Sequence, residues 1–297
     1  MTIDLKLGGH SKDLGDGFVV RRFLPSAQRQ SVGPFIFFDH FGPVKVEPSS
    51  QHDVRPHPHI GLATVTYLFE GAMMHRDSLG VAQRIEPGAI NWMTAGRGIV
   101  HSERRPEDLA DQVFVNHGLQ LWAALPAAHE EAEPAFSHTP AADIPVVDLP
   151  GVKLRVLIGE AFGAASPVPT FSKTIYLDIE LQAGAVLDLP LLAGEMALYA
   201  IDGALEVDDE PFPAQTLGVL SGAARLTAAS AVRVMLIGGD ALEGKRFIWW
   251  NFVSSRKMRI NEAADAWVAD AMGHVPGETE RIELPRRPVA SGEDAPL

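Results

Sequence analysis

Two short pairs of residues carry the clearest chemistry in this sequence. The first pair is His57 and His59, and the second is His101 and Glu103. Each pair has the i, i+2 spacing that places two side chains on the same face of a β-strand. Two strands that meet in one cavity would therefore bring together three imidazoles and one carboxylate. We predict a metal site with these four ligands.

The residue types limit which metals this site can hold. A single histidine is more often a surface or core residue than a ligand, but two such pairs in apolar, glycine-marked strands favour a metal. The chain has no cysteine, which excludes thiolate ligands. Imidazoles with one carboxylate suit Fe, Mn, Co, Ni, Cu or Zn and disfavour Mg and Ca. Four ligands leave open positions on most of these metals, whereas zinc could be fully coordinated and structural.

Three other histidines lie near the predicted ligands in the sequence. His75 is followed two residues later by Asp77. We consider it a weaker ligand candidate than the four, and expect a hydrogen-bond donor behind the metal site. His52 and His40 are expected to be structural.

Length and hydrophobic pattern predict two domains built from short strands. The chain has 297 residues, 46% of them hydrophobic, and apolar stretches bounded by Gly and Pro dominate up to about residue 239. Such a pattern is typical of β-sandwiches or β-barrels. The predicted strands are 35–38, 63–69, 89–93, 113–122, 154–158, 174–181, 196–201 and 232–237.

A change in composition marks the expected domain boundary. Residues 123–149 are rich in Ala, Pro, Glu and Asp, which predicts a connection that runs over the surface. We therefore expect a metal-binding domain at 1–135 and a second domain at 136–297. The second domain should include a helix at 261–272, where Ala, Trp, Val and Met have the spacing of one apolar face.

A weak internal repeat indicates that the two domains are copies of one β-fold. Residues 66–77 and 198–209 share Tyr, Gly, Ala and Asp at one offset of 132. The same offset places leucines, Leu189 and Leu191, where the first copy has its two histidines. A single metal therefore belongs to the N-terminal domain.

Charge and composition exclude several classes of function. A net charge of −13 and a pI near 5.3 argue against direct binding of nucleic acid, which requires clustered Lys and Arg. No apolar run approaches the length of a membrane span. The beginning of the chain lacks the basic start and apolar stretch of a secretory signal, and with no cysteine this leads us to expect a cytoplasmic protein.

Two ordered motifs resemble the pirin family of the cupin superfamily. They are PHPHIGLATVTYLFEGAMMHRDSLG at 56–80 and IEPGAINWMTAGRGIVHSE at 85–103. The runs FDHFGP at 38–43 and FIWWNF at 247–252 are also similar to pirin segments. The resemblance implies an all-β bicupin, with two β-barrel domains and a metal only in the first.

The resemblance also implies a cofactor and an activity. Pirins are commonly associated with iron(II) or another divalent transition metal, and several members look like quercetin dioxygenases that cleave a flavonol with O2 and release CO. The implied ligands are His57, His59, His101 and Glu103. One position departs from the usual pattern, since Ala63 stands where many pirins keep a glutamate. Glu103 is then the only carboxylate that the motifs supply, and the best candidate to accept the substrate proton.

Three hypotheses of function follow. The leading one is a metal-dependent dioxygenase with a phenolic, quercetin-like flavonol and O2 as substrates. The alternative is a non-enzymatic, redox-responsive regulator that binds a transcription factor or a metabolic enzyme, for which an acidic chain suits a protein partner better than DNA. The third is a β-barrel stabilised by structural zinc, a role for which proteins usually use Cys.

Overall fold

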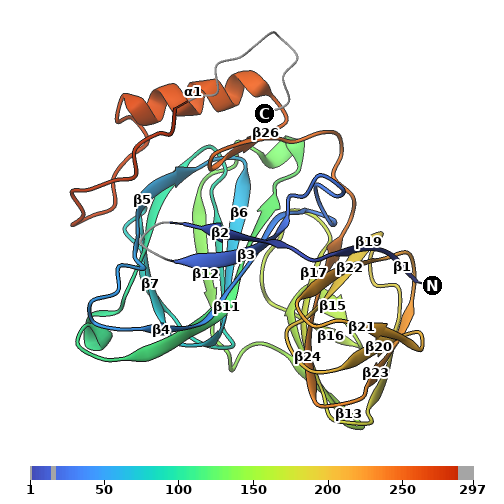
Figure 1. Ribbon diagram of the computed structural model, residues 1–297. Coiled ribbons are helices and arrows are strands. Elements are labelled where there is room, and N and C mark those ends of the chain that lie inside the picture. The colour runs from blue at the N-terminus through green and yellow to red at the C-terminus, as the bar shows by residue number, and fades with distance from the viewer. Residues whose placement is uncertain (1, 15–17, 287–297) are drawn as a thin grey trace.

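The computed structural model shows two β-barrels side by side (Figure 1) and describes residues 2–14 and 18–286. Each barrel consists of a seven-stranded and a four-stranded sheet, and every pair of neighbouring strands is antiparallel. The bicupin expected from the sequence is confirmed. Among the described residues, no helix is long and apolar enough to cross a membrane.

The first barrel contains both predicted ligand pairs. Its larger sheet has the order β12 (Ala135–Thr139), β9 (Ile90–Thr94), β6 (Leu62–Glu70), β11 (Phe114–Ala124), β4 (Phe35–Val46), β3 (Val19–Leu24) and β2 (His10–Asp13). Its smaller sheet has the order β5 (Val54–His59), β10 (Ile99–Arg104), β7 (Met73–Asp77) and β8 (Ala82–Ile85). Short 3₁₀ helices at Glu107–Leu109 and Ala127–His129 flank β11.

The second barrel repeats this topology. Its larger sheet has the order β1 (Ile3–Leu7), β22 (Thr216–Leu220), β19 (Glu195–Ala200), β24 (Val232–Gly239), β17 (Thr174–Leu181), β14 (Val152–Ile158) and β13 (Val146–Leu149). Its smaller sheet has the order β18 (Val186–Leu189), β23 (Ala224–Ala228), β20 (Leu205–Val207) and β21 (Glu210–Phe212). A small hairpin, β15 (Glu160–Ala161) with β16 (Ala164–Ala165), lies outside these sheets.

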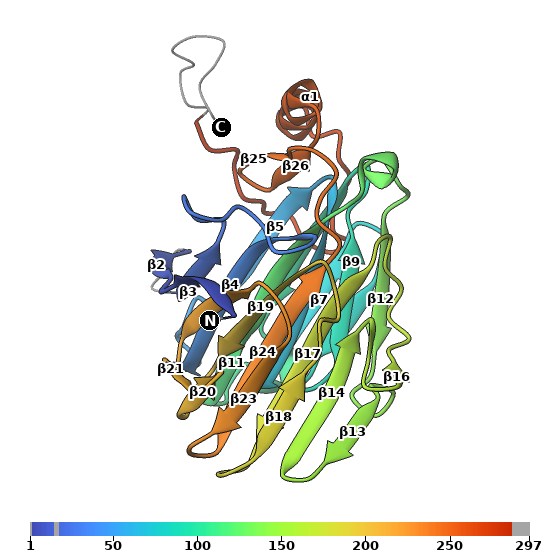
Figure 2. The same ribbon diagram turned by 90° about the vertical axis from the view of Figure 1, so that its right-hand side faces the viewer.

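The two seven-stranded sheets pack against each other, so their central strands are apolar on both faces. In β6, Val65 and Tyr67 lie in a core cluster that also contains Tyr176 and Tyr199 of the second barrel. Leu62, on the other face of β6, packs with residues that belong to the interior of the first barrel. Burial on both faces explains why these strands appear as continuous apolar stretches in the sequence. In Figure 2 the strands of the two sheets run in similar directions.

The interiors of the two barrels differ as the repeat predicts. A cluster of buried aliphatic side chains fills the second barrel and includes Leu187 and Leu189 of β18, the strand that occupies the place of β5. Leu191, by contrast, is 59% exposed. The second barrel therefore presents no imidazole at the position of the first ligand pair.

In two respects the strands of the two barrels do not follow the expected division of the chain between residues 135 and 136. β1, at the start of the chain, is an edge strand of the second barrel, paired with β22. The segment 123–149, expected to be a surface connection, contains β12, which completes the first barrel, and β13, which belongs to the second. Both are short edge strands with mostly exposed or half-buried residues, which a composition rich in Ala, Pro and acidic residues does not reveal. The boundary itself stays a prediction.

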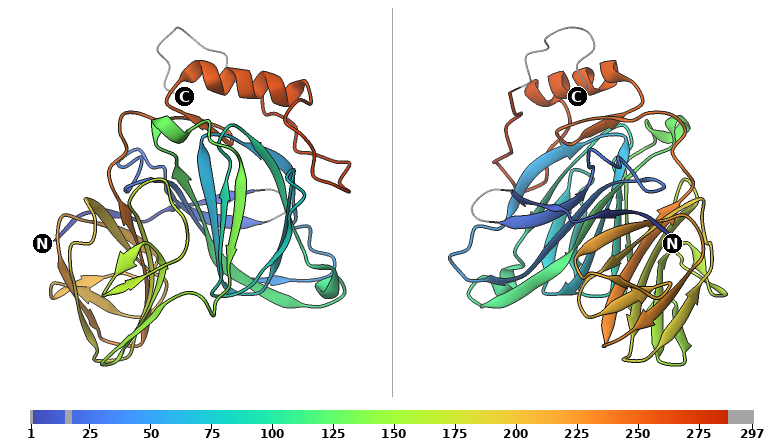
Figure 3. Two further views of the ribbon diagram at one scale, coloured as in Figure 1. Left: turned by 180° about the vertical axis from the view of Figure 1, so that it is seen from behind. Right: turned by 45° about the vertical axis from the view of Figure 1, so that its right-hand side comes forward.

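The last described segment returns to the first barrel (Figure 3). The hairpin of β25 (Phe247–Trp249) and β26 (Phe252–Ser254) precedes α1 (Lys257–Val268), and Phe252 forms a parallel bridge with Ile60 next to β5. The helix begins and ends four residues earlier than expected. Its buried face starts at Ile260 and ends at Trp267, whereas Val268 is exposed, so the apolar stripe lies nearer the N-terminus than we predicted.

Candidate metal centre

The predicted ligands lie on two neighbouring strands of the smaller sheet. β10 runs antiparallel to β5, and His101 is the direct cross-strand partner of His57. β5 is the edge of this sheet, a position that tolerates Pro56 and Pro58 because an edge strand needs fewer backbone donors. The sequence PHPH therefore forms a strand that directs both imidazoles to one side.

Three imidazoles meet inside the first barrel. The ligand atoms of His57, His59 and His101 lie within 4.8 Å of one another. Their ring centroids are 4.3 to 5.0 Å apart, and all three side chains are buried. The spacing in the sequence therefore predicted the contact between these three residues. Among the described residues, this triad is the group of His and acidic side chains with the geometry to hold a metal ion.

Hydrogen bonds leave the Nε2 atoms of the triad free. The His57 Nδ1 lies 2.8 Å from the Arg55 carbonyl oxygen, and the His59 Nδ1 lies 3.2 Å from that of Asn251. A carbonyl only accepts, so each Nδ1 carries the proton and donates it. The Nε2 of His101 is buried without a hydrogen-bond partner. Three inward-facing nitrogen lone pairs, one of them an unpartnered buried atom, fit a divalent transition metal.

Burial keeps the three imidazoles neutral, which is the form that binds a metal. Removal from water lowers the pKa of His57 to about 4 and lowers the pKa of both His59 and His101 well below the usual value. The neighbouring imidazoles lower the pKa of His59 and His101 further. Protons therefore compete weakly with a metal at neutral pH.

Glu103 follows His101 on the same face of β10, and its side chain also lines the cavity. It is not one of the three residues whose ligand atoms cluster within 4.8 Å. The pairing of β10 with β5 is irregular between His101 and Glu103, so the carboxylate is offset along the strand. Burial raises the pKa of Glu103 to about 7. Its role as the fourth ligand stays a prediction.

Ala63 lies away from this cavity. Its side chain is fully buried in the core between the two larger sheets, on the face of β6 opposite to Leu62. A longer side chain on this face would point toward the second barrel. With this backbone, a glutamate at position 63 would not reach the metal centre, so its replacement by alanine costs the centre no carboxylate.

The triad opens into a cavity of about 560 Å³ in the first barrel. This volume is in the usual range for sites that bind small molecules. Ten of its 24 lining residues are aromatic or aliphatic, which suits a flat aromatic ligand. The apolar lining residues are Leu14, Phe18, Val20, Phe37, Phe41, Val54, Met73, Trp122, Trp250 and Ile282.

One wall of the cavity is a layered stack that the sequence did not reveal. Phe37 and Trp122 stack with ring centroids 4.1 Å apart and an interplanar angle of 11°. The Arg22 guanidinium lies over Phe37 at 4.2 Å and makes two 2.8 Å hydrogen bonds to the buried carboxylate of Asp39. Burial raises the pKa of Asp39, although Arg22 opposes this shift. These residues come from β3, β4 and β11. The one signal in the sequence is that side chains of a strand alternate between its two faces, which could have indicated that Phe37 and Asp39 share a face.

The C-terminal segment completes the site from outside the sheet. Asn251, whose backbone carbonyl oxygen accepts the hydrogen bond from His59 Nδ1, lies in the hairpin of β25 and β26. The backbone amide of Ile282 donates to the Pro56 carbonyl beside the first ligand, at 2.8 Å. Both Asn251 and Ile282 line the cavity. Residues about two hundred positions after the first ligand pair therefore help to fix its geometry.

The three other histidines that lie near the ligands in the sequence occupy different parts of the structure. His75 is buried directly behind His101, with 3.4 Å between their Nδ1 atoms. His52 lines the cavity and stacks on Phe18. His40 lies between the two barrels, where its Nδ1 is 2.7 Å from the Tyr199 hydroxyl.

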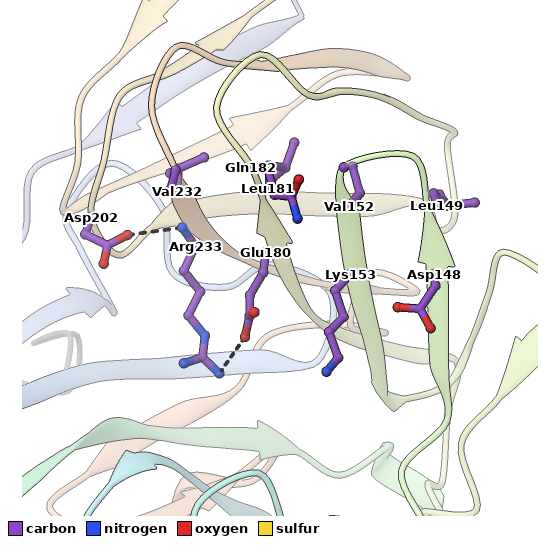
Figure 4. Close-up of a pocket in the computed structure, with 12 residues that line it drawn as sticks. Asp148, Leu149, Val152, Lys153, Glu180, Leu181, Gln182, Asp202, Val232 and Arg233 are labelled. Carbon is purple, nitrogen blue, oxygen red and sulfur yellow. Dashed lines mark hydrogen bonds and ion pairs between the residues drawn. The ribbon is translucent and has the colours of Figure 1, made fainter.

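A second cavity, of about 520 Å³, lies on the second barrel (Figure 4). Charged side chains from β14, β17 and β24 line it, and Arg233 lies 3.9 Å from Glu180. The Arg233 amide also donates to the Asp202 carboxylate. Because this cavity contains no imidazole and its arginine is already paired, we assign it no role in metal chemistry.

Comparison with known proteins places both barrels in one family. A family model described as Pirin matches residues 17–123, and a model described as Pirin C-terminal cupin domain matches residues 176–273. A pirin-like protein of Caulobacter vibrioides is 45% identical over 91% of this chain and 94% of its own length.

Two further proteins are similar over most of their length. A Pseudomonas aeruginosa protein provisionally named quercetin 2,3-dioxygenase is 38% identical, covering 88% of this chain and 82% of that protein. The crystal structure of quercetin 2,3-dioxygenase from Acinetobacter baumannii superposes with a TM-score of 0.89 at 36% identity, and covers 96% of each chain.

Proposed function

Because this chain belongs to the pirin family, we propose that it is a metal-dependent dioxygenase that cleaves a quercetin-like flavonol with O2 and releases CO. The observation that carries the proposal is the buried triad of His57, His59 and His101 at the base of an aromatic-lined cavity. The cavity gives a small molecule access to the triad, which a purely structural zinc site would not need. The names of the similar bacterial proteins support the same activity.

In this proposal the triad and Glu103 hold one divalent transition metal. Iron(II) is our first choice, and Mn, Co, Ni, Cu or Zn fit the same donor atoms. A bound metal would supply Lewis acidity toward the 3-hydroxyl and 4-carbonyl oxygens of a flavonol. The hydrogen bonds from His57 and His59 to backbone carbonyls fix the two ring orientations before the metal arrives.

Glu103 is suited to accept the proton of the flavonol 3-hydroxyl, because its carboxylate lines the cavity beside the triad. Burial raises the pKa of Glu103 to about 7 in the metal-free protein, whereas a bound divalent cation would favour the ionised form that accepts a proton. The stacked wall of Phe37 and Trp122 can orient the flat ring system and exclude water from it. Arg22, beside that wall, is held by Asp39 and can contact an anionic phenol.

The test is quercetin bleaching with simultaneous measurement of O2 uptake and CO release. The protein is assayed for metal and reconstituted with iron(II), beside His101→Ala and Glu103→Gln. We expect stoichiometric O2 consumption by the wild type and none by His101→Ala, which loses a ligand. Glu103→Gln removes both the base and a charged ligand while it keeps the shape, so at matched iron content it should lower turnover more than it lowers substrate binding.

His138→Ala is the matched control. His138 hydrogen-bonds to Asn91, and neither residue lines the cavity. Its replacement should leave turnover unchanged. A filled iron site without turnover of quercetin would contradict the proposed activity, and would favour the redox-responsive regulator.

A further inference from the structure

A chain of three buried side chains connects one candidate metal ligand to a carboxylate. Asp77 Oδ2 lies 3.0 Å from His75 Nε2, and His75 Nδ1 lies 3.4 Å from His101 Nδ1. The side chains of His75 and Asp77 are 3% and 0% exposed, so no water competes for these contacts. Neither residue lines the cavity, so both act from behind His101.

Strand pairing places this chain beside the metal centre. β10 lies between β5 and β7, and His101 has His57 as its cross-strand partner on one side and Asp77 on the other. His75 is in turn the partner of Glu103. Directly opposed residues of antiparallel strands share a face, so all these side chains point into the barrel.

Several contacts fix the two side chains behind His101. Asp77 Oδ1 accepts the backbone amides of Leu79, at 2.9 Å, and Val81, at 3.1 Å, which leaves Oδ2 for His75. The His75 ring stacks on Phe136, with centroids 4.3 Å apart and an interplanar angle of 19°. The position of the carboxylate and the plane of the His75 ring are therefore both set by their surroundings.

Counting hydrogens assigns each proton in the chain. A carboxylate accepts only, so His75 Nε2 must carry the proton in the contact with Asp77. A neutral His75 then has a lone pair at Nδ1, which faces His101 Nδ1. His101 must donate from Nδ1, and this leaves its Nε2 as the lone pair that has no other partner.

We propose that Asp77 and His75 are positioning residues that hold His101 in the tautomer able to bind the metal through Nε2. The inference rests on the proposed metal centre but not on the identity of the substrate. His57 and His59 obtain the same tautomer from backbone carbonyls, whereas His101 obtains it from side chains. A single substitution can therefore reverse the proton arrangement at this one ligand.

The main test is Asp77→Asn, with metal affinity as the readout. The asparagine oxygen can still accept the amides of Leu79 and Val81, so the turn is kept, but its amide nitrogen now donates to His75 Nε2. The His75 proton then moves to Nδ1 and faces the proton of His101. We expect the affinity of the metal-free protein for cobalt(II), measured by competition with a chromophoric chelator, to fall about 10- to 100-fold.

A second pair of variants separates hydrogen bonding from packing. In His75→Gln the side-chain amide can accept from His101 and donate to Asp77, so cobalt(II) affinity should stay within a few-fold of the wild type. In His75→Leu the acceptor is lost, and we expect a loss similar to that of Asp77→Asn. The visible absorption of bound cobalt(II) should change in the leucine variant and not in the glutamine variant.

His40→Gln is the control for loss of a buried histidine, because His40 is buried and lies away from the cavity. It should bind cobalt(II) as tightly as the wild type, and circular dichroism would confirm that each variant is folded. Wild-type affinity in folded Asp77→Asn or His75→Leu would overturn the inference, as would equal losses in the glutamine and leucine variants of His75. These outcomes are independent of quercetin turnover, which tests the proposed function separately.

Discussion

Acidification is expected to destabilise the metal-free protein through His40, an imidazole buried between the two barrels. His40 Nδ1 lies 2.7 Å from the Tyr199 hydroxyl of the second barrel, and His40 Nε2 lies 2.8 Å from His117 Nε2. Burial, together with smaller contributions from the nearby charges of His117 and Arg21, lowers the pKa of His40 from 6.5 to about 4. The folded protein therefore keeps this ring neutral where the unfolded chain is protonated.

The sign and size of the effect follow from these two pKa values. Below pH 6.5 the unfolded chain binds a proton at His40 that the folded protein does not bind until about pH 4, so stability falls with pH across this window. Between pH 7 and pH 5 the loss from this residue is about 2 kcal/mol. Above pH 6.5 both states are neutral and the effect vanishes.

Urea unfolding of metal-free wild type and His40→Gln at pH 7 and pH 5 measures this difference. The wild type should lose about 2 kcal/mol more than the variant, since all other groups titrate in both proteins. His274→Gln, at an exposed position, is the control and should follow the wild type. Equal losses in wild type and His40→Gln would refute the reasoning, because they would show that His40 gains its proton without cost in the folded state.

Three further predictions concern contacts around the site and between the barrels. Gly61→Ala should lower the free energy of unfolding by more than about 1 kcal/mol, and thermal melts would measure this loss. The glycine has a φ of +68°, and an added Cβ would lie 2.0 Å from the Val253 carbonyl oxygen. Trp122→Ala should cost about 3 kcal/mol in urea unfolding by leaving a void beside the cavity. Arg233→Met should cost about 3 kcal/mol because the buried Asp178 carboxylate loses its counter-ion and keeps only the hydrogen bond from the Tyr67 hydroxyl. The double variant with Asp178→Asn should recover part of this loss in a double-mutant cycle.

The sequence predicted the strands that are buried on both faces better than the others. All eight predicted strands are present, and all belong to the two seven-stranded sheets that pack together. Strands of the smaller sheets, such as β20 and β23, are short and have one exposed face, so their apolar signal is weak. The fold class could therefore be predicted, while most strands of the smaller sheets could not.

The same contrast holds at the candidate metal centre. The i, i+2 spacing of His57 and His59, together with His101, predicted the triad because a strand fixes side-chain direction locally. The contact of Asn251 with His59 depends on the fold of a segment far along the chain, and no local pattern reports it. The position of Glu103 relative to the triad depends in turn on an irregular strand pairing, which spacing alone cannot predict.

The exchange of chain segments between the barrels has a consequence for biosynthesis. β1 is synthesised some two hundred residues before its partner β22. The hairpin of β25 and β26, which supplies the acceptor for His59, is made later still. The second barrel therefore cannot close before β22 and β24 are made, and the first barrel lacks the acceptor for His59 until the hairpin of β25 and β26 is made, so loading with metal should follow synthesis of this hairpin.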